Sequence, residues 1–360
     1  MLSSTACPDH SGKSRLAGKT RIALIGFGTV GQGLCEILLS KKDYLKSKYN
    51  FEGEIVAISD VLKGAVYCKD GLDIQQCLDL VKSGKSLEEY NNNCEKGWDS
   101  IRTIKETNAD IICELAYTDV KTGEPAITHC KTAFANKKNI VTSNKGPAAL
   151  QYSEMQKLAE MNNVKFMIEG TVMSGTPVLN LANGPLAGCE ITAIKGILNG
   201  TTNYMLSEME KGMTFDAVLK KAQELGYAEA DPTGDVEGFD AMAKVIILAN
   251  VLMNARISAT DVQREGITQI TPQMIEDAKE ENARWKLIGT IEKQEGGVKA
   301  SVKPEKLPLT HPLANIMGAT NALTFTTDLL GDVTIIGAGA GKIETGYSIL
   351  TDILAIHRQQ

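Results

Sequence analysis

The segment 226–244, GYAEADPTGDVEGFDAMAK, carries the densest set of chemically capable side chains, with five acids and one lysine. Asp240 and Lys244 are four residues apart, so they share one face of a helix, and the apolar run VIILANVLM follows directly. A lysine between an acid and an apolar core suits proton transfer, because burial and nearby charge tune its pKa. A surface ion pair at a helix start has the same spacing, so the spacing alone leaves both interpretations open. The acids are Glu229, Asp231, Asp235, Glu237 and Asp240.

A second motif, GFGTVG at residues 26–31, has the form G-x-G-x-x-G between an apolar run and a helical pattern. In this context Gly26 allows a tight turn, Gly28 lets a pyrophosphate approach the backbone, and Gly31 lets helix and strand pack closely. The helix N-terminus then offers free N–H groups to phosphates. The motif predicts dinucleotide binding, although a glycine-rich turn in another α/β fold has the same composition. The predicted cofactor contacts are Gly26, Phe27, Gly28, Thr29, Val30 and Gly31.

Asp60 ends the next apolar run, where an acidic residue usually holds a ribose 2′-hydroxyl. This position favours NAD, whereas Lys63 nearby would suit the 2′-phosphate of NADP. The sequence leaves the choice between the two cofactors open. A cap of a turn or helix is the alternative role for Asp60.

Lys145 lies in TSNKG (142–146), at the end of an apolar run that reads as a strand. Ligands of open parallel sheets bind beyond the carboxyl ends of the strands. Lys145 is therefore placed to face the nicotinamide and the substrate, unless it is an ordinary exposed loop lysine.

The elements that position these residues follow from short apolar runs that alternate with helical patterns. Runs at 21–25, 55–59, 109–116 and 140–144 read as strands, with helices after Gly28 and over 127–139. This alternation predicts an α/β fold with a Rossmann-type parallel sheet covered on both faces. The polar segment 62–100 is too long for a plain crossover and reads as an insertion or a decorated helix.

The pattern changes near residue 150 to one that predicts a second, α+β domain with an open sheet. Its strand-like runs are 164–175, 190–200 and segments near 297–302 and 322–327, and helices are expected over 214–226 and 236–254. The final strand–glycine–helix segment is expected to pack back on the first domain. The predicted division is a flexible arm over 1–20, a dinucleotide-binding domain over 21–148 completed by 335–360, and a substrate-binding, catalytic and dimerisation domain over 149–334.

Composition narrows the function classes. The chain has 360 residues and a formal charge of 38 − 44 = −6, which argues against nucleic acid and anionic membrane as partners. No apolar run is long enough to span a membrane, and the first 20 residues lack the apolar stretch of a secretory signal. The eight scattered cysteines are expected to be reduced thiols in a cytoplasmic protein. With four distant histidines, neither a zinc site nor a histidine-based triad is expected.

Together these motifs resemble the homoserine dehydrogenase family. GFGTVG, TSNKG, EGTVMSGTP (169–177), GILNGTTNY (196–204), GYAEADPTGDVEGFDAMAK and GAGAGKIETGYSILTDI (337–353) fall in the order found in that family. They span residues 21 to 353, nearly the whole chain. The resemblance implies reversible NADH- or NADPH-dependent reduction of L-aspartate 4-semialdehyde to L-homoserine, in the threonine and methionine branch of amino-acid biosynthesis.

The resemblance also implies roles for single residues. Lys244 matches the proton-transferring lysine, Lys145 a second active-site lysine, and Asp240 an acid that positions substrate or water. The implied substrate contacts are Glu229, Asp235, Thr201 and Tyr227, and the implied further cofactor contacts are Ala116, Lys145 and Gly341.

Three further expectations come from the resemblance. A sodium ion, found in some family members, would be bound by Glu169 and the carbonyls of Val172, Ser174 and Thr176. A homodimer or homotetramer is expected, because the family dimerises and because EITAIKGIL and ALTFTTDLL look too apolar for one small sheet to cover. Relatives often carry an ACT domain or a fused aspartate kinase, and neither is recognisable here.

Two other functions share part of this pattern. Aspartate-semialdehyde dehydrogenase acts on the same aldehyde but needs a nucleophilic cysteine, and neither Cys130 nor Cys189 lies in a recognisable Cys/His motif. A non-catalytic nicotinamide-binding sensor on the same fold would be expected to lose the active-site lysines, yet both are present.

Overall fold

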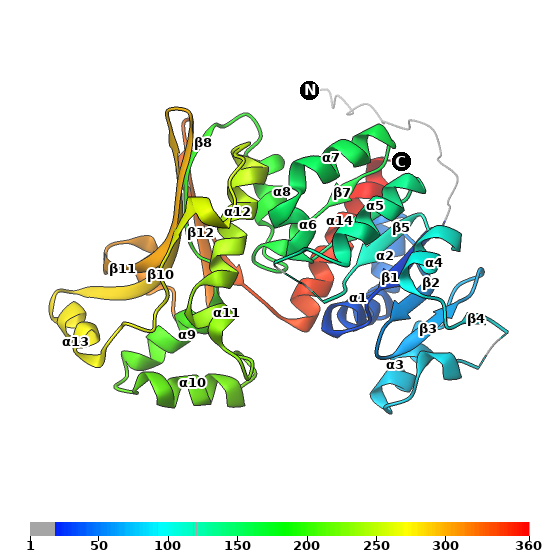
Figure 1. Cartoon of the computed structure of the whole chain (residues 1–360), viewed down its shortest axis with the longest axis horizontal. Helices are drawn as coiled ribbons and strands as arrows, with labels where there is room; N and C mark the ends of the chain where they lie inside the picture. The colour runs from blue at the N-terminus through cyan, green and yellow to red at the C-terminus, as the bar shows by residue number, and fades with distance from the viewer. Residues whose placement is uncertain (1–18, 92, 118, 120, 360) are drawn as a thin grey trace, which may run out of the picture.

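The computed structural model describes residues 19–91, 93–117, 119 and 121–359, and it contains two β-sheets (Figure 1). The first sheet has seven strands in the order β4-β3-β2-β1-β5-β6-β7, and the second has six in the order β13-β12-β8-β10-β11-β9. This arrangement confirms the predicted fold class, a parallel-strand domain joined to a second domain with an open sheet.

The first sheet is built from the apolar runs found in the sequence. Strands β2, β1, β5, β6 and β7 pair in parallel, while β3 and β4 extend the edge antiparallel. The strands are β1 (Thr20–Ile25), β2 (Gly53–Asp60), β3 (Gly64–Tyr67), β4 (Glu95–Lys96), β5 (Ile111–Glu114), β6 (Asn139–Thr142) and β7 (Phe166–Met167).

Helices cover both faces of this sheet. Successive residues of β1 point to opposite faces, and they pack against different helices. Ile22 and Leu24 share a core with Leu34 of α1 and Ile349 of α14, whereas Ala23 packs with the α5 side. The helices of this part are α1 (Thr29–Ser40), α2 (Lys42–Tyr49), α3 (Ile74–Lys82), α4 (Ser100–Glu106), α5 (Ala126–Ala135), α6 (Lys145–Leu150), α7 (Tyr152–Met161) and α14 (Lys342–Gln359). The C-terminal helix α14 thus returns to the first sheet and lies against α1, as Figure 1 shows in red and blue.

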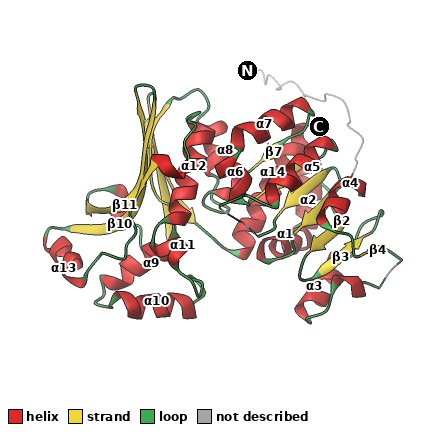
Figure 2. Cartoon of the chain, viewed as in Figure 1, coloured by secondary structure: helices red, strands yellow, loops and turns green. Residues whose placement is uncertain are grey.

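The second sheet is largely antiparallel, and only β9 pairs in parallel with its neighbour. Its strands are β8 (Ile191–Ile197), β9 (Val262–Arg264), β10 (Ala283–Gln294), β11 (Gly297–Pro308), β12 (Thr320–Thr327) and β13 (Gly331–Ala338). Its helices are α8 (Val178–Asn183), α9 (Gly200–Met209), α10 (Phe215–Glu224), α11 (Thr233–Val236), α12 (Phe239–Leu252) and α13 (Pro272–Glu280). Helix α12 runs between this sheet and the first domain (Figure 2).

Several sequence-based boundaries need correction. Of the two interpretations of 62–100, the insertion fits, because this segment adds β3 and β4 to the edge of the first sheet along with the helix α3. The run 164–175 forms only the short strand β7, which pairs with β6 and not with the second sheet. Residues 335–338 belong to β13 and pair with β12, because the chain turns back in a tight hairpin between Thr327 and Gly331. The return to the first domain therefore begins at α14. The division at residue 148 stays a prediction, and the 1–20 arm lies outside the described residues except for Lys19 and Thr20, the latter in β1.

The expectation of reduced cysteines is wrong for one pair. Cys68 and Cys94 form a disulfide, with their Cα atoms 5.0 Å apart, because β3 and β4 lie side by side in the sheet. Cys35, Cys77, Cys113, Cys130 and Cys189 are free thiols. The sequence separation of 26 residues gave no sign of this pairing. Within the described part of the chain, no helix is both long and apolar enough to cross a membrane.

Candidate active site

The glycine motif forms the start of α1 as the sequence predicts. Gly26 has φ of +98°, a conformation that favours glycine. A Cβ on Gly31 would lie 2.8 Å from the carbonyl oxygen of Gly26, so this glycine allows the close packing of helix and strand. Gly28 is the N-cap of α1 and borders open space, because a Cβ at this position would have no neighbour within 4 Å. The helix start thus leaves room for a phosphate next to free backbone N–H groups.

The Asp60 carboxylate accepts hydrogen bonds from three backbone N–H groups. These are the N–H of Phe27 at 2.7 Å and those of Leu62 and Lys63 at 2.9 Å each. The Lys63 ammonium lies 3.8 Å from the same carboxylate. The turn-capping role is therefore present, and Asp60 also holds the glycine loop. A role toward a ribose hydroxyl stays a prediction.

Lys145 is placed by the ends of β5 and β6. The Asn144 side chain caps α6 by accepting from the N–H of Gly146 at 3.0 Å, and its amide donates to the carbonyls of Ala116 and Tyr117. Lys145 is thus the first residue of α6, held beside the carboxyl ends of two parallel strands, which is where the sequence analysis expects it.

Helix α12 brings the second lysine to the same place. Lys244 is 6% exposed, and its ammonium donates to the carbonyl of Leu198 and to Oδ2 of Asp240, both at 2.7 Å. The Lys145 ammonium lies 3.5 Å from Oδ1 of Asp240. One carboxylate therefore faces two lysines from different parts of the chain. Burial raises the pKa of Asp240, but Lys244 and Lys145 outweigh it and hold this pKa well below the usual range.

Asn199 links the acids of this site, and the sequence analysis did not single it out. Its Nδ2 donates to Asp235 at 2.6 Å and to Asp240 at 2.9 Å, while its Oδ1 caps α9 through the N–H of Thr202. Asparagine before Gly-Thr-Thr is a helix-capping signal, and the GILNGTTNY motif contains this signal. Burial raises the pKa of Asp235, and the hydrogen bond from Asn199 opposes this effect.

The remaining predicted substrate residues surround α9. The Thr201 hydroxyl donates to the carbonyl of Tyr227 at 2.6 Å, and the ring of Tyr227 lies 5.0 Å from that of Tyr204. Tyr227 is 46% exposed. Glu229 is exposed in the loop between α10 and α11.

The glycine loop that precedes α14 comes from the second sheet. Gly341 has φ of +140°, and its carbonyl accepts from the N–H of Thr345. Lys342 pairs with Glu36 of α1 at 2.6 Å, so its ammonium is engaged on that helix.

The residues expected to bind sodium lie together between β7 and α8. Met173 and Ser174 both have positive φ, which turns the loop sharply. The donors are all oxygens, as a hard cation requires. The Glu169 carboxylate, however, accepts from the N–H groups of Leu179 and Asn180, and burial raises its pKa to about 7. Among the expected carbonyl ligands, that of Thr176 also accepts a hydrogen bond, from the N–H of Val178 at 2.8 Å.

Ser100, His129 and Glu114 form a hydrogen-bonded set, although the sequence predicts no histidine-based triad. His129 lies 3.1 Å from Glu114 and 2.8 Å from the Ser100 hydroxyl, because α4 and α5 pack side by side at the end of β5. The Thr142 hydroxyl donates to the carbonyl of Glu114 at 2.6 Å. The histidine is buried, and the set connects α4, α5, β5 and β6 below Lys145. Burial raises the pKa of the Cys130 thiol well above its ordinary value, which does not suit a nucleophile.

Comparison with known proteins identifies the family. The homoserine dehydrogenase family model matches residues 177–354, and the model for glutamate, leucine, phenylalanine and valine dehydrogenases matches residues 6–170. An NAD(+)-dependent homoserine dehydrogenase of Pseudomonas canavaninivorans is 44% identical over 94% of this chain and 96% of its own length. A homoserine dehydrogenase of Methanocaldococcus jannaschii is 43% identical over 93% of this chain and 98% of its own.

A solved structure agrees with these relatives. A hyperthermophilic archaeal homoserine dehydrogenase in complex with NADPH superposes with a TM-score of 0.81 and 29% identity, over 95% of this chain and 99% of that one. The chain belongs to the homoserine dehydrogenase family. The comparisons give no support to the alternative of a non-catalytic sensor.

Proposed function

Starting from membership in the homoserine dehydrogenase family, we propose that this chain catalyses the reversible reduction of L-aspartate 4-semialdehyde to L-homoserine with NADH or NADPH. The observation that carries the proposal is the group formed by Lys145, Asp240 and Lys244. This reaction needs a proton donor at the carbonyl oxygen, and Lys244 supplies one from a buried position. An ammonium has three N–H donors, and Lys244 uses two of them on Leu198 and Asp240. The third is left for the substrate oxygen.

Asp240 sets the charge of this group. The Asp240 carboxylate lies between the two lysines and orients both of them through its contacts with their amino groups. With Asp240 ionised, the three side chains carry a net charge of +1, which favours the negative charge that develops on the carbonyl oxygen during reduction. Lys145 and Lys244 together stabilise this oxygen, and Lys244 protonates it.

The acidic side chains beside the lysines suit the ammonium end of an amino acid. We assign this role to Asp235, with Thr201 and Tyr227 on the wall of the same pocket. Glu229 lies in an exposed loop, so its contribution requires that the loop close over the substrate. Asn199 keeps Asp235 and Asp240 in place through its two hydrogen bonds.

The nucleotide is assigned to the start of α1. The cofactor supplies the hydride, and this chain's residues hold its phosphates and orient its ring. Gly26, Phe27, Gly28, Thr29, Val30 and Gly31 form the phosphate turn, with Ala116, Lys145 and Gly341 near the nicotinamide end. Asp60 and Lys63 lie where the ribose of the adenosine half would bind, and their opposite charges leave both NADH and NADPH open. The relatives include an NAD(+)-dependent enzyme and an NADPH complex, which supports this breadth.

Three further assignments belong to the proposal. The chain forms a homodimer or homotetramer, it works in the cytoplasm, and the carbonyls of Val172, Ser174 and Thr176 can take a sodium ion. The apolar character of β12 gives no argument for assembly, because Ala322, Leu323 and Phe325 are fully buried within one chain. Leu329, Leu330 and Ile336, around β13, are instead the exposed apolar side chains of this sheet edge, at 71%, 61% and 56% exposure.

A direct assay tests the activity. The purified full chain is mixed with L-homoserine and either NAD⁺ or NADP⁺, and then with L-aspartate 4-semialdehyde and either reduced cofactor. We expect turnover in both directions and none with homoserine analogues that lack the hydroxyl group. A chain that binds the nucleotide tightly and turns over neither substrate would reject the proposal.

A further inference from the structure

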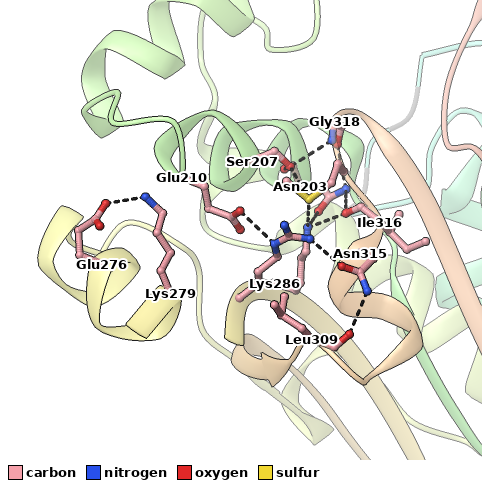
Figure 3. Close-up of polar contacts among 12 residues, drawn as sticks. Asn203, Ser207, Glu210, Glu276, Lys279, Lys286, Leu309, Asn315, Ile316 and Gly318 are labelled. Carbon is pink, nitrogen blue, oxygen red and sulfur yellow. Dashed lines mark hydrogen bonds and ion pairs between the residues drawn. The ribbon is translucent and has the colours of Figure 1, made fainter. Parts of the chain in front are cut away.

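A buried lysine outside the catalytic group lies behind the first turn of α9. Lys286, on β10, has no solvent-exposed surface. Its ammonium donates to Oδ1 of Asn203 at 3.0 Å and to the carbonyl of Ile316 at 2.5 Å, with the Met317 sulfur 3.5 Å away (Figure 3). All three partners are neutral. Burial lowers the pKa of Lys286 to about 8, and the charge of Glu210 opposes this effect.

Asn203 connects Lys286 to two segments, helix α9 and residues 316–320. Its Nδ2 donates to the carbonyls of Ile316, Gly318 and Thr320 at 3.1, 2.9 and 3.0 Å. The Ser207 hydroxyl, one turn further along α9, donates to the carbonyl of Asn203 and accepts from the N–H of Gly318. Figure 3 shows these groups converging between α9 and the turn before β12. Lys286 and Asn203 therefore fasten α9 to residues 316–320.

Arg284 is a second cation on β10 that contacts α9. Arg284 lies two residues before Lys286, so both side chains leave the same face of β10. Arg284 pairs with Glu210 at the end of α9, at 3.1 Å, and donates to the Asn315 side chain at 2.8 Å. Both ends of α9 are thus held by β10, the outer end by an ion pair and the inner end by Lys286.

The inner end of α9 belongs to the active site. Asn199, the N-cap, holds Asp235 and Asp240, and Thr201 is the second residue of the helix. Asn203 is one helical turn after Asn199, and its N–H donates to the carbonyl of Asn199. A Cβ on Gly200 would lie 2.7 Å from the carbonyl oxygen of Ala319, so the segment fastened by Asn203 also packs directly on the helix start.

We propose that Lys286 is a positioning residue for the amino-acid substrate, which acts through Asn203 to fix the first turn of α9 and with it Asn199 and Thr201. A buried cation without a carboxylate partner is costly, and an apolar side chain of similar length would pack there at lower cost. The ammonium donates directional hydrogen bonds to the side-chain oxygen of Asn203 and the main-chain oxygen of Ile316 at once, and methionine has no such donor. This inference rests on the proposed function, since Asn199 and Thr201 matter only if α9 faces the substrate.

The test compares two buried lysines. Lys286→Met removes the ammonium and keeps most of the side-chain volume. Lys138→Met is the matched control, because the Lys138 ammonium also donates to a buried carbonyl, that of Thr107 at 2.7 Å, but at the opposite end of β6 from Lys145. Both variants are measured for melting temperature, for KM and kcat with L-homoserine, and for the Kd of NADPH.

A shift of about 1 Å in substrate-positioning groups costs up to about 100-fold in rate. We therefore expect Lys286→Met to lower kcat/KM for homoserine about tenfold or more, mainly through a higher KM because the groups displaced are those that hold the substrate, with less than about a twofold change in the NADPH Kd. Lys138→Met should keep its KM, whatever the change in its melting temperature. If Lys286→Met does not fold, Lys286→Gln, which keeps one donor, replaces it, and the same rise in KM at a smaller size is expected.

Two results would overturn the inference. One is an unchanged KM in a folded Lys286 variant, as in the Lys138 control, since this would mean a purely structural lysine. The other is an equal rise in homoserine KM and NADPH Kd, which would mean general loosening. An inactive wild-type chain would instead reject the proposed function and this inference with it, so the two failures are distinguishable.

Discussion

The Lys244 ammonium lies 2.7 Å from the Asp240 carboxylate, one helical turn away on α12. The same carboxylate lies 3.5 Å from Lys145, the first residue of α6, which follows strand β6 of the first sheet. The Asp240 carboxylate therefore connects α12 with the start of α6, and we propose that proton transfer takes place here.

Asp240→Asn tests the role of the negative charge. The amide keeps the shape but removes the negative charge between the two lysines, so we expect their side chains to move apart and lose their shared orientation. The predicted result is a fall in kcat of about 10- to 100-fold, within the range of a positioned acid–base group. Because the Asp240 pKa lies well below its usual range, wild-type activity should show no loss from Asp240 between about pH 5 and 8. A variant with wild-type kcat would show that the lysines need no carboxylate between them.

Asp60→Ser tests the choice of cofactor. Loss of the carboxylate removes the predicted contact with a ribose hydroxyl and the repulsion of a 2′-phosphate, so the ratio of kcat/KM for NADPH over NADH should rise. Both cofactors are expected to bind somewhat more weakly, because the hydrogen bond to the N–H of Phe27 is lost as well. Lys63→Ala is the complementary variant, and it should lower the same ratio. An unchanged ratio in both variants would mean that neither side chain meets the ribose.

The two buried lysines should make stability depend on pH. Burial lowers the pKa of Lys138 and of Lys286 from 10.5 to about 8 in the folded chain. Between these values the unfolded chain binds more protons than the folded one, so stability rises with pH. One pKa unit corresponds to about 1.4 kcal/mol. Each lysine should therefore contribute a gain on the order of 2 to 3 kcal/mol as pH rises from about 8 to about 10.5.

Urea denaturation of wild type and Lys286→Met at several pH values isolates this effect. The difference in the free energy of unfolding should move in favour of wild type as pH rises. A difference that stays constant would mean that Lys286 keeps its proton in the folded chain.

Ile336→Lys tests the proposed assembly. Ile336 is 56% exposed on β13, the outermost strand of the second sheet, and unpaired edges with apolar side chains favour association. We expect wild type to sediment as a dimer or tetramer at micromolar concentration and Ile336→Lys to dissociate to smaller species. Tyr44→Lys, at an exposed aromatic residue on α2, is the control and should leave assembly unchanged. A wild-type monomer with full activity would contradict the assembly proposal.

The sequence contained most of what places the catalytic group. Gly26, Gly28 and Gly31 predict the start of α1, and the i, i+4 spacing of Asp240 and Lys244 predicts their contact, because local helix geometry fixes both. The position of Lys145 follows from strand-end rules for parallel sheets. The family motifs then name the reaction.

What the sequence did not reveal depends on packing between distant segments. His129 meets Glu114 and Ser100 only because α4 and α5 lie together, and Lys286 meets Asn203 across 83 positions of sequence. Cys68 and Cys94 pair because β3 and β4 are neighbours. The prediction that placed the run of β7 in the second sheet is wrong, since an apolar run carries no information about its partner strand.

The measurement that tests the central claim most directly is kcat and NADPH Kd in the same Lys244→Met variant. Methionine keeps much of the length and apolar bulk of lysine but has neither charge nor proton. We predict a fall in kcat of about 10²- to 10⁴-fold, with a nearly unchanged Kd because the phosphate turn lies in the other domain. Lys145→Met should also lose rate and is expected to weaken cofactor binding. Near-normal turnover in Lys244→Met would contradict proton transfer by this residue, and a lost NADPH affinity would mean that it supports the fold or the nucleotide site.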